Sequence, residues 1–316
     1  TRPDAFTEDV ALECMRLGAT RVELGVQILD DEILASVNRG HGVAEVAEAT
    51  RIAKDLGLKV CYHVMPGLPG SGPEKDVESF RQMFDDPRFR PDMVKIYPTL
   101  VVKGTKLHED WAAGRYHPYN TDQAVRVIAE MKKLVPEYVR IQRIQRDIPV
   151  PLIEAGVDKG HLRELVKELL ALQGQGCRCI RCREVGLLGI SEIDPQELVP
   201  SIISYDASGG REEFISFVLE NNALAGYVRL RKPEGDTALV RELKVFGRMA
   251  RIGEHGEWQH LGLGGRLLAM AEASAEKDGY SSIKVTSGVG VRGYYASRGY
   301  ARSLPHMEKR LASDKD

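Results

Sequence analysis

The sequence predicts an α/β chain built from two domains. Its first half alternates short apolar strands with amphipathic helices, and the part beyond Glu192 is a series of strands separated by turn signals. Strands that alternate with helices of about 10–15 residues are typical of parallel sheets, whereas closely spaced strands joined by turns are typical of antiparallel ones. With 316 residues, the chain is long enough to bury two hydrophobic cores.

The first half follows a strand–helix order. Apolar, β-branched runs predict strands, and apolar residues at helical spacing predict helices. The strands are expected at 21–26, 58–64, 93–97 and 138–141, and the helices at 43–56, 74–84 and 121–134. Ligands of parallel sheets bind beyond the carboxyl ends of the strands. The Pro- and Gly-rich segment 65–73 and the residues Tyr97 and Pro98 are expected at that edge.

The second half has a different pattern of predicted secondary structure. An amphipathic helix is predicted at 161–173, and a helix at 264–277 follows a set of strands. The strands are expected at 201–205, 213–219, 224–230, 238–246 and 282–286. The change in pattern places one domain at 1–148, a linker at 149–190 and a second domain at 191–316.

Composition narrows the classes of function. The formal net charge of −2 is not that of a generally nucleic-acid-binding surface, although a local basic patch remains compatible with it. No run of about eighteen apolar residues is present, so no membrane span is predicted. The five cysteines include a cluster of three and follow no signal sequence, which favours a reducing cytoplasm over disulfides.

A glycine-rich turn opens the helix predicted at 264–277. Backbone N–H groups at a helix N-terminus suit a pyrophosphate, and glycine lets the phosphate oxygens approach closely. The alternative is an ordinary helix-opening turn. The turn reads Gln259, His260, Leu261, Gly262, Leu263, Gly264, Gly265, Arg266.

The order strand, glycine-rich turn, helix, strand, Tyr294-Tyr295 resembles the GNAT acetyltransferase family. The resemblance implies that backbone amides of 261–265 bind acetyl-CoA and that strand 240–246 separates from its neighbour to admit the pantetheine arm. Tyr294 or Tyr295 would act as a general acid at the thioester sulfur; the alternative is packing. The implied cofactor-binding residues are Glu242, Leu243, Val245, Gln259, His260, Leu261, Gly262, Leu263, Gly264, Gly265, Arg266 and Tyr295.

Three cysteines fall within six residues. Cys177, Cys179 and Cys182 form C-x-C-x-x-C, and a tight loop can turn three thiolates toward one zinc ion. The alternatives are three unrelated thiols or a 4Fe–4S cluster, whose spacing in radical SAM enzymes is different. We predict zinc, with the fourth ligand open among His161, His255, His260 and a non-protein group.

Basic residues gather near the end of the first predicted domain. Their side chains can bind phosphates, although a solvated surface is the simpler interpretation. The candidate nucleic-acid-binding residues are Lys132, Lys133, Arg140, Arg143 and Arg146.

Further strings occur in one order along nearly the whole chain, at 1–4, 21–27, 65–70, 95–100, 145–149, 177–185, 259–264 and 287–290 with Tyr294-Tyr295. Together they resemble the catalytic subunits of Elongator in their stand-alone prokaryotic form. The resemblance implies a fold made of a partial radical SAM (β/α) barrel, a zinc-binding linker and a GNAT-type domain.

The resemblance also implies an activity, namely carboxymethylation of the tRNA wobble uridine at C5. Acetyl-CoA would supply the two-carbon unit, S-adenosylmethionine and a 4Fe–4S cluster would activate its methyl group, and tRNA would stimulate thioester hydrolysis. The partner would be the anticodon arm of tRNA, without other Elongator subunits. Lys95, a candidate catalytic residue, and also Glu23 and Gln27 are candidates for lining the reactant pocket; the alternative for each is an exposed or salt-bridged role.

One departure limits this expectation. The family's cluster-binding cysteines precede the segment that matches Thr1, and the 316 residues do not include them. We therefore expect this chain to bind acetyl-CoA and tRNA without completing the modification by itself. Two other functions stay open: a protein lysine acetyltransferase with Glu242 as its base, and a non-catalytic RNA-binding protein.

Overall fold

The computed structural model describes residues 1–145, 148–190, 193–246 and 262–311. The chain divides into two compact units, one made of Thr1–Phe6, Glu23–Ala49 and Val60–Cys179, and the other of Thr7–Val22, Thr50–Lys59 and Ile180–Asp316. Two short segments of the first half thus belong to the second unit. The units therefore divide the chain differently from the sequential segments 1–148, 149–190 and 191–316.

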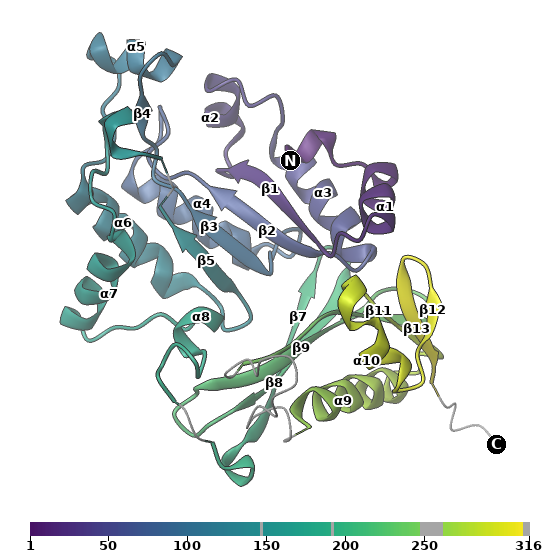
Figure 1. Cartoon of the computed structure of the whole chain (residues 1–316). Helices are drawn as coiled ribbons and strands as arrows, with labels where there is room; N and C mark the ends of the chain where they lie inside the picture. Colours follow the sequence, from purple (N-terminus) through teal and green to yellow (C-terminus); the bar gives the residue numbers. More distant parts are fainter. Residues whose placement is uncertain (146–147, 191–192, 247–261, 312–316) are drawn as a thin grey trace. The chain divides into compact units, whose positions relative to one another are not determined.

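The first unit is organised around a four-stranded sheet in the order β1-β2-β3-β5 (Figure 1). The pairs β2–β3 and β3–β5 are parallel, as the strand–helix alternation predicted. The strands are β1 (Arg21–Gln27), β2 (Lys59–Val64), β3 (Met93–Ile96) and β5 (Arg140–Ile144), and a separate antiparallel pair joins β4 (Val101–Val102) to β6 (Ile153–Ala155).

Residues typical of helix N-termini mark the starts of two of the helices between these strands. Asn120 and Gln123 form a capping box at the start of α6. Pro73 occupies the first turn of α4, where the helix makes no hydrogen bond that would need its missing N–H. Helix α6 packs against both α4 and α7, and each of the three buries apolar side chains. The helices are η1 (Pro3–Ala5), α2 (Asp31–Ser36), α3 (Val43–Asp55), α4 (Pro73–Asp85), α5 (Lys106–Ala112), α6 (Thr121–Leu134), η2 (Val150–Leu152) and α7 (Leu162–Leu172).

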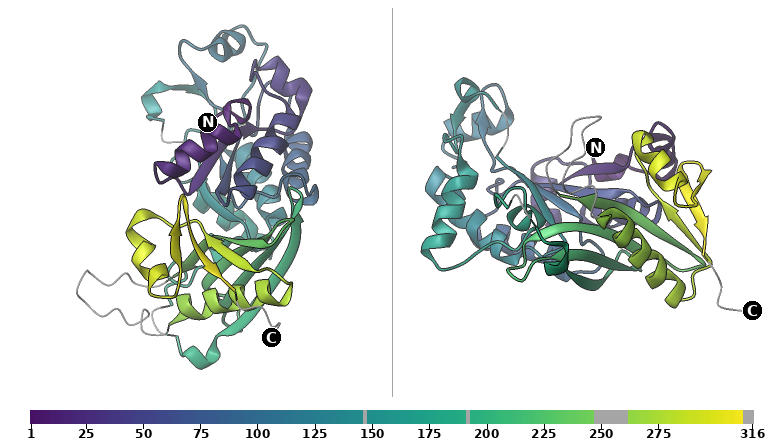
Figure 2. Two further views of the ribbon diagram at one scale, coloured as in Figure 1. Left: turned by 90° about the vertical axis from the view of Figure 1, so that its right-hand side faces the viewer. Right: turned by 60° about the horizontal axis from the view of Figure 1, so that its bottom comes forward.

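The second unit contains a seven-stranded sheet in the order β12-β13-β11-β10-β9-β8-β7. Helix α9 (Leu263–Lys277) lies along one face of it (Figure 2), and apolar side chains of both form the core. The strands are β7 (Val199–Ala207), β8 (Gly210–Val218), β9 (Leu224–Lys232), β10 (Thr237–Val245), β11 (Ser282–Val285), β12 (Ala301–Ser303) and β13 (His306–Arg310); the other helices are α1 (Glu8–Arg16), α8 (Ile180–Arg183), η3 (Pro195–Glu197), η5 (Val289–Val291) and α10 (Arg292–Ala296).

Most predicted elements are confirmed, with shifts at their ends. Strand β5 starts two residues later than expected because Pro136 and the turn that follows it delay the pairing with β3. The short elements α1, α2, α5, β12 and β13 were not predicted, since each is too short for a clear period. Among the described residues, no helix is long and apolar enough to cross a bilayer.

Candidate functional site

Strands β10 and β11 separate part-way along their length. Their parallel register runs from Thr237↔Ser282 to Val240↔Val285, and the N–H of Thr286 donates to the carbonyl of Val240. Beyond that point β11 has ended, whereas β10 continues to Val245 in register with β9. The separation expected from the GNAT resemblance is therefore seen among the described residues, in which no strand pairs with this edge of β10 beyond Val240.

Helix α9 begins at Leu263, after Gly262 in the left-handed conformation (φ 60°). The N–H of Arg266 is bonded to the carbonyl of Gly262, so the amides of 263–265 are the ones that the helix itself cannot satisfy. The side chain of Leu263 is buried in the core, so this residue can contribute only its backbone to a ligand. The predicted residues Gln259, His260 and Leu261 lie outside the described residues.

The side chains of the remaining predicted cofactor-binding residues lie in different environments. Leu243 packs against the core, whereas Val245 is partly exposed at the end of β10. The guanidinium of Arg266 stacks on the ring of Phe217. The carboxylate of Glu242 accepts a hydrogen bond from Arg229 Nε at 3.0 Å, so it is already engaged in an ion pair.

The two adjacent tyrosines differ in their surroundings. The Tyr294 hydroxyl is buried and has no hydrogen-bond partner within the described ranges. A Cβ built on Gly264 would lie 2.7 Å from it and 3.8 Å from the side chain of Val245, so Tyr294 sits at the N-terminus of α9 beside the open edge of β10. Burial raises the pKa of Tyr294, which keeps the phenol protonated at neutral pH.

Tyr295 instead belongs to the core of the second unit. Its side chain is 6% exposed, and its ring packs edge-on against Tyr294 and Tyr300. Burial raises its pKa to about 12. The two tyrosines therefore differ in position: Tyr294 lies at the N-terminus of α9, whereas Tyr295 belongs to the core.

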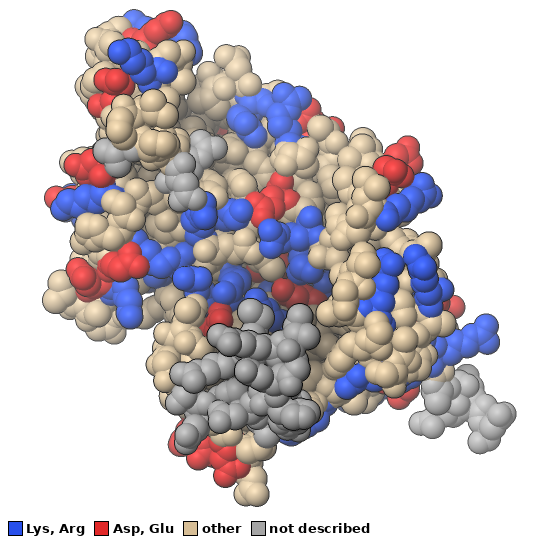
Figure 3. All heavy atoms as spheres, viewed as in Figure 1, with Lys and Arg blue, Asp and Glu red and all other residues tan. Residues whose placement is uncertain are grey.

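A polar row crosses the sheet of the first unit. His63 is in register with Lys95, and Lys95 with Arg143, on neighbouring parallel strands. Glu23 Oε2 lies 2.6 Å from His63 Nε2 and 2.5 Å from Lys95 Nζ. Figure 3 shows Lys and Arg side chains, with acidic groups among them, over β1, β2, β3 and β5.

The row contains groups that the sequence analysis did not select. Burial lowers the pKa of His63, although the Glu23 carboxylate opposes the shift, so the imidazole is neutral at pH 7. The period-two alternation of β2, which puts Cys61 and His63 on one face, is the signal that could have identified it. Glu23, Cys61 and His63 bring their ligand atoms within 4.8 Å of one another.

Gln27, which the sequence analysis placed near a strand end, is the last residue of β1. It has a φ of 69°, and its side-chain oxygen is buried with no partner in the part of the chain that the structure describes. Gln145, directly after β5, has the same two features, with a φ of 80°. Strained backbone of this kind is concentrated at functional sites. Both residues lie at the carboxyl ends of strands, where ligands of parallel sheets bind.

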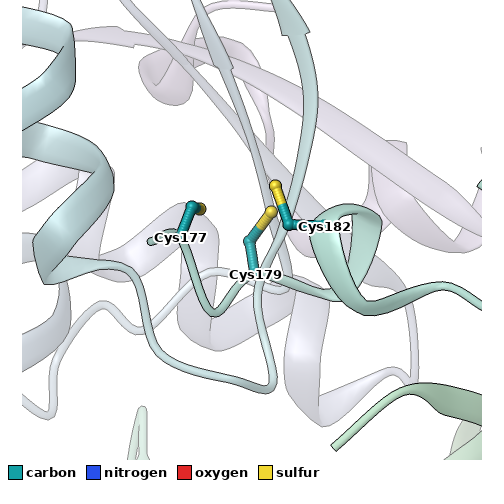
Figure 4. A group of neighbouring side chains, drawn as sticks. All are labelled: Cys177, Cys179 and Cys182. Carbon is teal, nitrogen blue, oxygen red and sulfur yellow. The ribbon is translucent and has the colours of Figure 1, made fainter. Parts of the chain in front are cut away.

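The three clustered cysteines converge. The Sγ atoms of Cys177, Cys179 and Cys182 all lie within 4.8 Å of one another; the first two are on the segment that leads into α8, and Cys182 is in α8 itself (Figure 4). None of the chain's cysteines forms a disulfide. Three thiolates this close match the ligand set of a zinc site. Of the predicted fourth ligands, His161 does not join this group, and His255 and His260 lie outside the described residues.

The predicted basic residues are not equivalent. Lys132 is 2% exposed on the packed side of α6, so it offers little surface to a phosphate, and a tRNA contact for it stays a prediction. Lys133 pairs with Glu130 at 2.6 Å. Arg140 is partly buried, Arg143 is exposed, and Arg146 lies outside the described residues.

Comparisons with known proteins match both halves of the chain. Residues 1–84 match the radical SAM superfamily, 91–171 the radical SAM C-terminal domain and 192–311 the acetyltransferase (GNAT) domain. The fold therefore defines a protein that joins a radical SAM domain to a GNAT acetyltransferase domain, as the sequence predicted.

Relatives of known name cover nearly the whole chain. The tRNA uridine(34) acetyltransferases of Methanocaldococcus infernus and Dehalococcoides mccartyi are 46% and 47% identical, and Elongator complex protein 3 of Saccharomyces cerevisiae is 41% identical, each over 98% of this chain. The chain spans 61%, 71% and 59% of their respective lengths.

A solved structure agrees. The Elp3 protein of the archaeon M. infernus with an N-terminal deletion (1–46) is 46% identical and superimposes with a TM-score of 0.93, over 98% of this chain and 77% of that one. The chain belongs to the family of tRNA uridine(34) acetyltransferases and Elongator complex protein 3.

Proposed function

We propose that this chain takes part in the carboxymethylation of the tRNA wobble uridine (U34) at C5, with acetyl-CoA as the two-carbon donor. The observation that carries the proposal is the meeting of three features in the second unit. The open edge of β10 and the N-terminus of α9 converge beside the buried hydroxyl of Tyr294. An acyl-CoA needs a partner for its pantetheine amides, donors for its pyrophosphate and a proton source for its thiolate.

Each of these groups has a defined task. The amides of 263–265 would bind the pyrophosphate, because the partial positive charge of a helix N-terminus favours anions. The open edge of β10 between Glu242 and Val245 would pair with the pantetheine amides as a neighbouring strand does. Tyr294, kept protonated by burial, would donate its proton to the sulfur when the thioester is cleaved.

The cofactors of the radical SAM half can be tested against the residues present. S-adenosylmethionine with a 4Fe–4S cluster supplies hydrogen abstraction from the acetyl methyl group when bound. Within the described residues, the one group of three thiols is C-x-C-x-x-C, which is not the radical SAM spacing. The row of Glu23, His63 and Lys95 would line the reactant pocket on this side.

The cysteine triad fits a zinc ion better. Zinc–sulfur bonds of about 2.3 Å hold tetrahedral thiolates roughly 3.8 Å apart, close to the observed grouping. We propose that Cys177, Cys179 and Cys182 bind a structural zinc that stabilises the segment between α7 and α8.

The proposed partner is the anticodon arm of tRNA, with Lys133, Arg140, Arg143 and Arg146 as phosphate contacts. The bacterial and archaeal relatives carry an enzyme name of their own rather than a subunit name, which supports action without other Elongator subunits. The lysine acetyltransferase alternative receives no support from Glu242, whose carboxylate is engaged with Arg229.

The purified chain of residues 1–316 tests this proposal with labelled acetyl-CoA, adding tRNA in one reaction and lysine peptides in another. We expect release of CoA and acetate stimulated by tRNA, without labelled peptide. Peptide labelling that is indifferent to tRNA would instead establish the lysine acetyltransferase. A wobble-base variant of the tRNA anticodon arm serves as the matched control, because it retains the phosphates.

A further inference from the structure

The separation of β10 from β11 coincides with a β-bulge. Val240 pairs with Leu230 and Glu242 with Arg229, so Arg241 is the extra residue. The last β10–β11 pair is Val240↔Val285, and the bulge therefore lies directly at the point where the two strands part. A bulge bends its strand and redirects the chain beyond it, and bulges are common next to active sites.

The side chain of this bulge residue is fully buried and tightly held. Its Nη2 and Nε donate to Glu212 Oε2 at 2.5 and 3.2 Å, and its Nη1 donates to the carbonyl oxygen of Leu58 at 2.9 Å. Both Arg241 and Glu212 are 0% exposed. One planar guanidinium therefore ties the bulge both to β8 and to the segment that follows α3.

Glu212 is the centre of a larger network on this face of the sheet. Its Oε1 accepts from Arg231 Nη1 at 3.2 Å and from Lys54 Nζ at 3.4 Å, and Arg231 also reaches Asp55. Arg51 also pairs with Asp55 at 2.9 Å, so four cations contact these two carboxylates. If Arg241 were removed, Lys54 and Arg231 would still balance Glu212 and Asp55, so the network does not need Arg241 for charge compensation.

A buried ion pair is costly to desolvate and is a weak source of net stability, but it restricts geometry. We propose that the Glu212–Arg241 pair, with the Leu58 carbonyl, is a positioning device that holds the β10 bulge and so sets the open strand edge that receives the pantetheine arm. This inference rests on the proposed binding of acetyl-CoA to the second unit. Neither residue has to touch the ligand.

The opposite face of the same sheet provides a matched control. Lys232 pairs there with Glu213 at 2.8 Å and with Asp278 at 2.6 Å, and it also bonds Ser274. It is nearly as buried as Arg241, with 5% of its surface exposed against 0%, but it contacts the C-terminal half of α9 and not the bulge. Loss of this cation removes the short ion pairs of Glu213 and Asp278 and leaves Glu213 with a longer pair to Arg211 at 3.9 Å, so it should reduce stability at least as much.

The test compares Arg241→Met with Lys232→Met by calorimetric titration with acetyl-CoA, and thermal unfolding is recorded for both. We expect Arg241→Met to weaken acetyl-CoA binding on the order of tenfold, as misplacement of a supporting group does. Lys232→Met should lower the unfolding temperature and leave Kd within twofold. Equal Kd values for the wild-type chain and Arg241→Met would overturn the inference.

Arg241→Lys separates charge from geometry and also serves if Arg241→Met does not fold. Lysine keeps a cation beside Glu212 but lacks the planar fork that reaches Glu212 and the Leu58 carbonyl together. We expect the Kd of Arg241→Lys to lie between those of the wild-type chain and Arg241→Met. If Arg241→Met does not fold, we expect Arg241→Lys to bind acetyl-CoA severalfold more weakly than the wild-type chain. A wild-type Kd for Arg241→Lys would contradict the positioning role. Absence of acetyl-CoA binding by the wild-type chain would instead refute the proposed function itself.

Discussion

The hydroxyl of Tyr294 occupies the space that a side chain at position 264 would need: a Cβ on Gly264 would lie 2.7 Å from the Tyr294 oxygen. The helix N-terminus and the tyrosine therefore pack closely, and a side chain at 264 would shift the Tyr294 hydroxyl. Gly262 is required for another reason, its positive φ.

Gly264→Ala should displace Tyr294 from the open edge of β10. We expect acetyl-CoA hydrolysis to fall about tenfold with the fold retained, because a misplaced catalytic group costs rate before stability. The control is Gly186→Ala, where an added Cβ meets nothing within 4 Å. If both variants hydrolysed acetyl-CoA at the wild-type rate, Gly264 would not shape the site.

Tyr294→Phe removes a buried hydroxyl that has no partner in the described part of the chain. Stability should not fall, because no hydrogen bond is lost. The rate of thioester cleavage should fall about 100-fold with little change in Kd, as for loss of a general acid. Since burial raises the pKa of Tyr294, the wild-type rate should persist at alkaline pH until that raised pKa is passed. Tyr295→Phe is the comparison, and an equal loss there would argue against this assignment.

The titration of His63 reports on the polar row of the first unit. Burial lowers the pKa of His63 below its ordinary value of about 6.5. As the pH falls below about 6.5, the unfolded chain takes up the proton first, so the free energy of unfolding declines until the folded-state pKa is passed. His63→Gln should lose less stability than the wild-type chain between pH 7 and pH 5, measured by urea unfolding.

NMR of the His63 ring measures the pKa of the imidazole in the folded chain directly. Glu23 raises the pKa of His63 against the effect of burial, so Glu23→Gln should lower the titration midpoint further. A midpoint at or above the ordinary value in the wild-type chain would show that the imidazole is not buried as described.

Zinc content tests the cysteine triad. Cys179→Ser should abolish the stoichiometric zinc found by metal analysis and lower the unfolding temperature, because the buried thiolate would be the central ligand. Cys61→Ser, which changes a buried cysteine outside the triad, should keep its zinc. Retention of zinc by Cys179→Ser would dismiss the site.

Local sequence patterns were sufficient to predict much of the fold and several of the candidate site residues. Period and turn signals predicted the parallel and antiparallel halves, and the glycine-rich turn, the clustered cysteines and the paired tyrosines are contiguous strings whose chemistry can be read without coordinates. The same strings sufficed for the family, because two unrelated folds follow one another in a fixed order.

Only the tertiary structure determined which way each side chain points, how deeply it is buried and which groups it contacts. It showed that Tyr294 and Tyr295 have different surroundings and that Lys132 is buried on α6. It also showed that Glu242 pairs with Arg229. Glu23, His63 and Lys95, which come from three strands, contact one another. Arg241 looked like one more strand residue, yet a one-residue bulge turned it toward Glu212 and Leu58. Such contacts join residues far apart in the chain, and a local pattern carries no information about which distant group a side chain will meet.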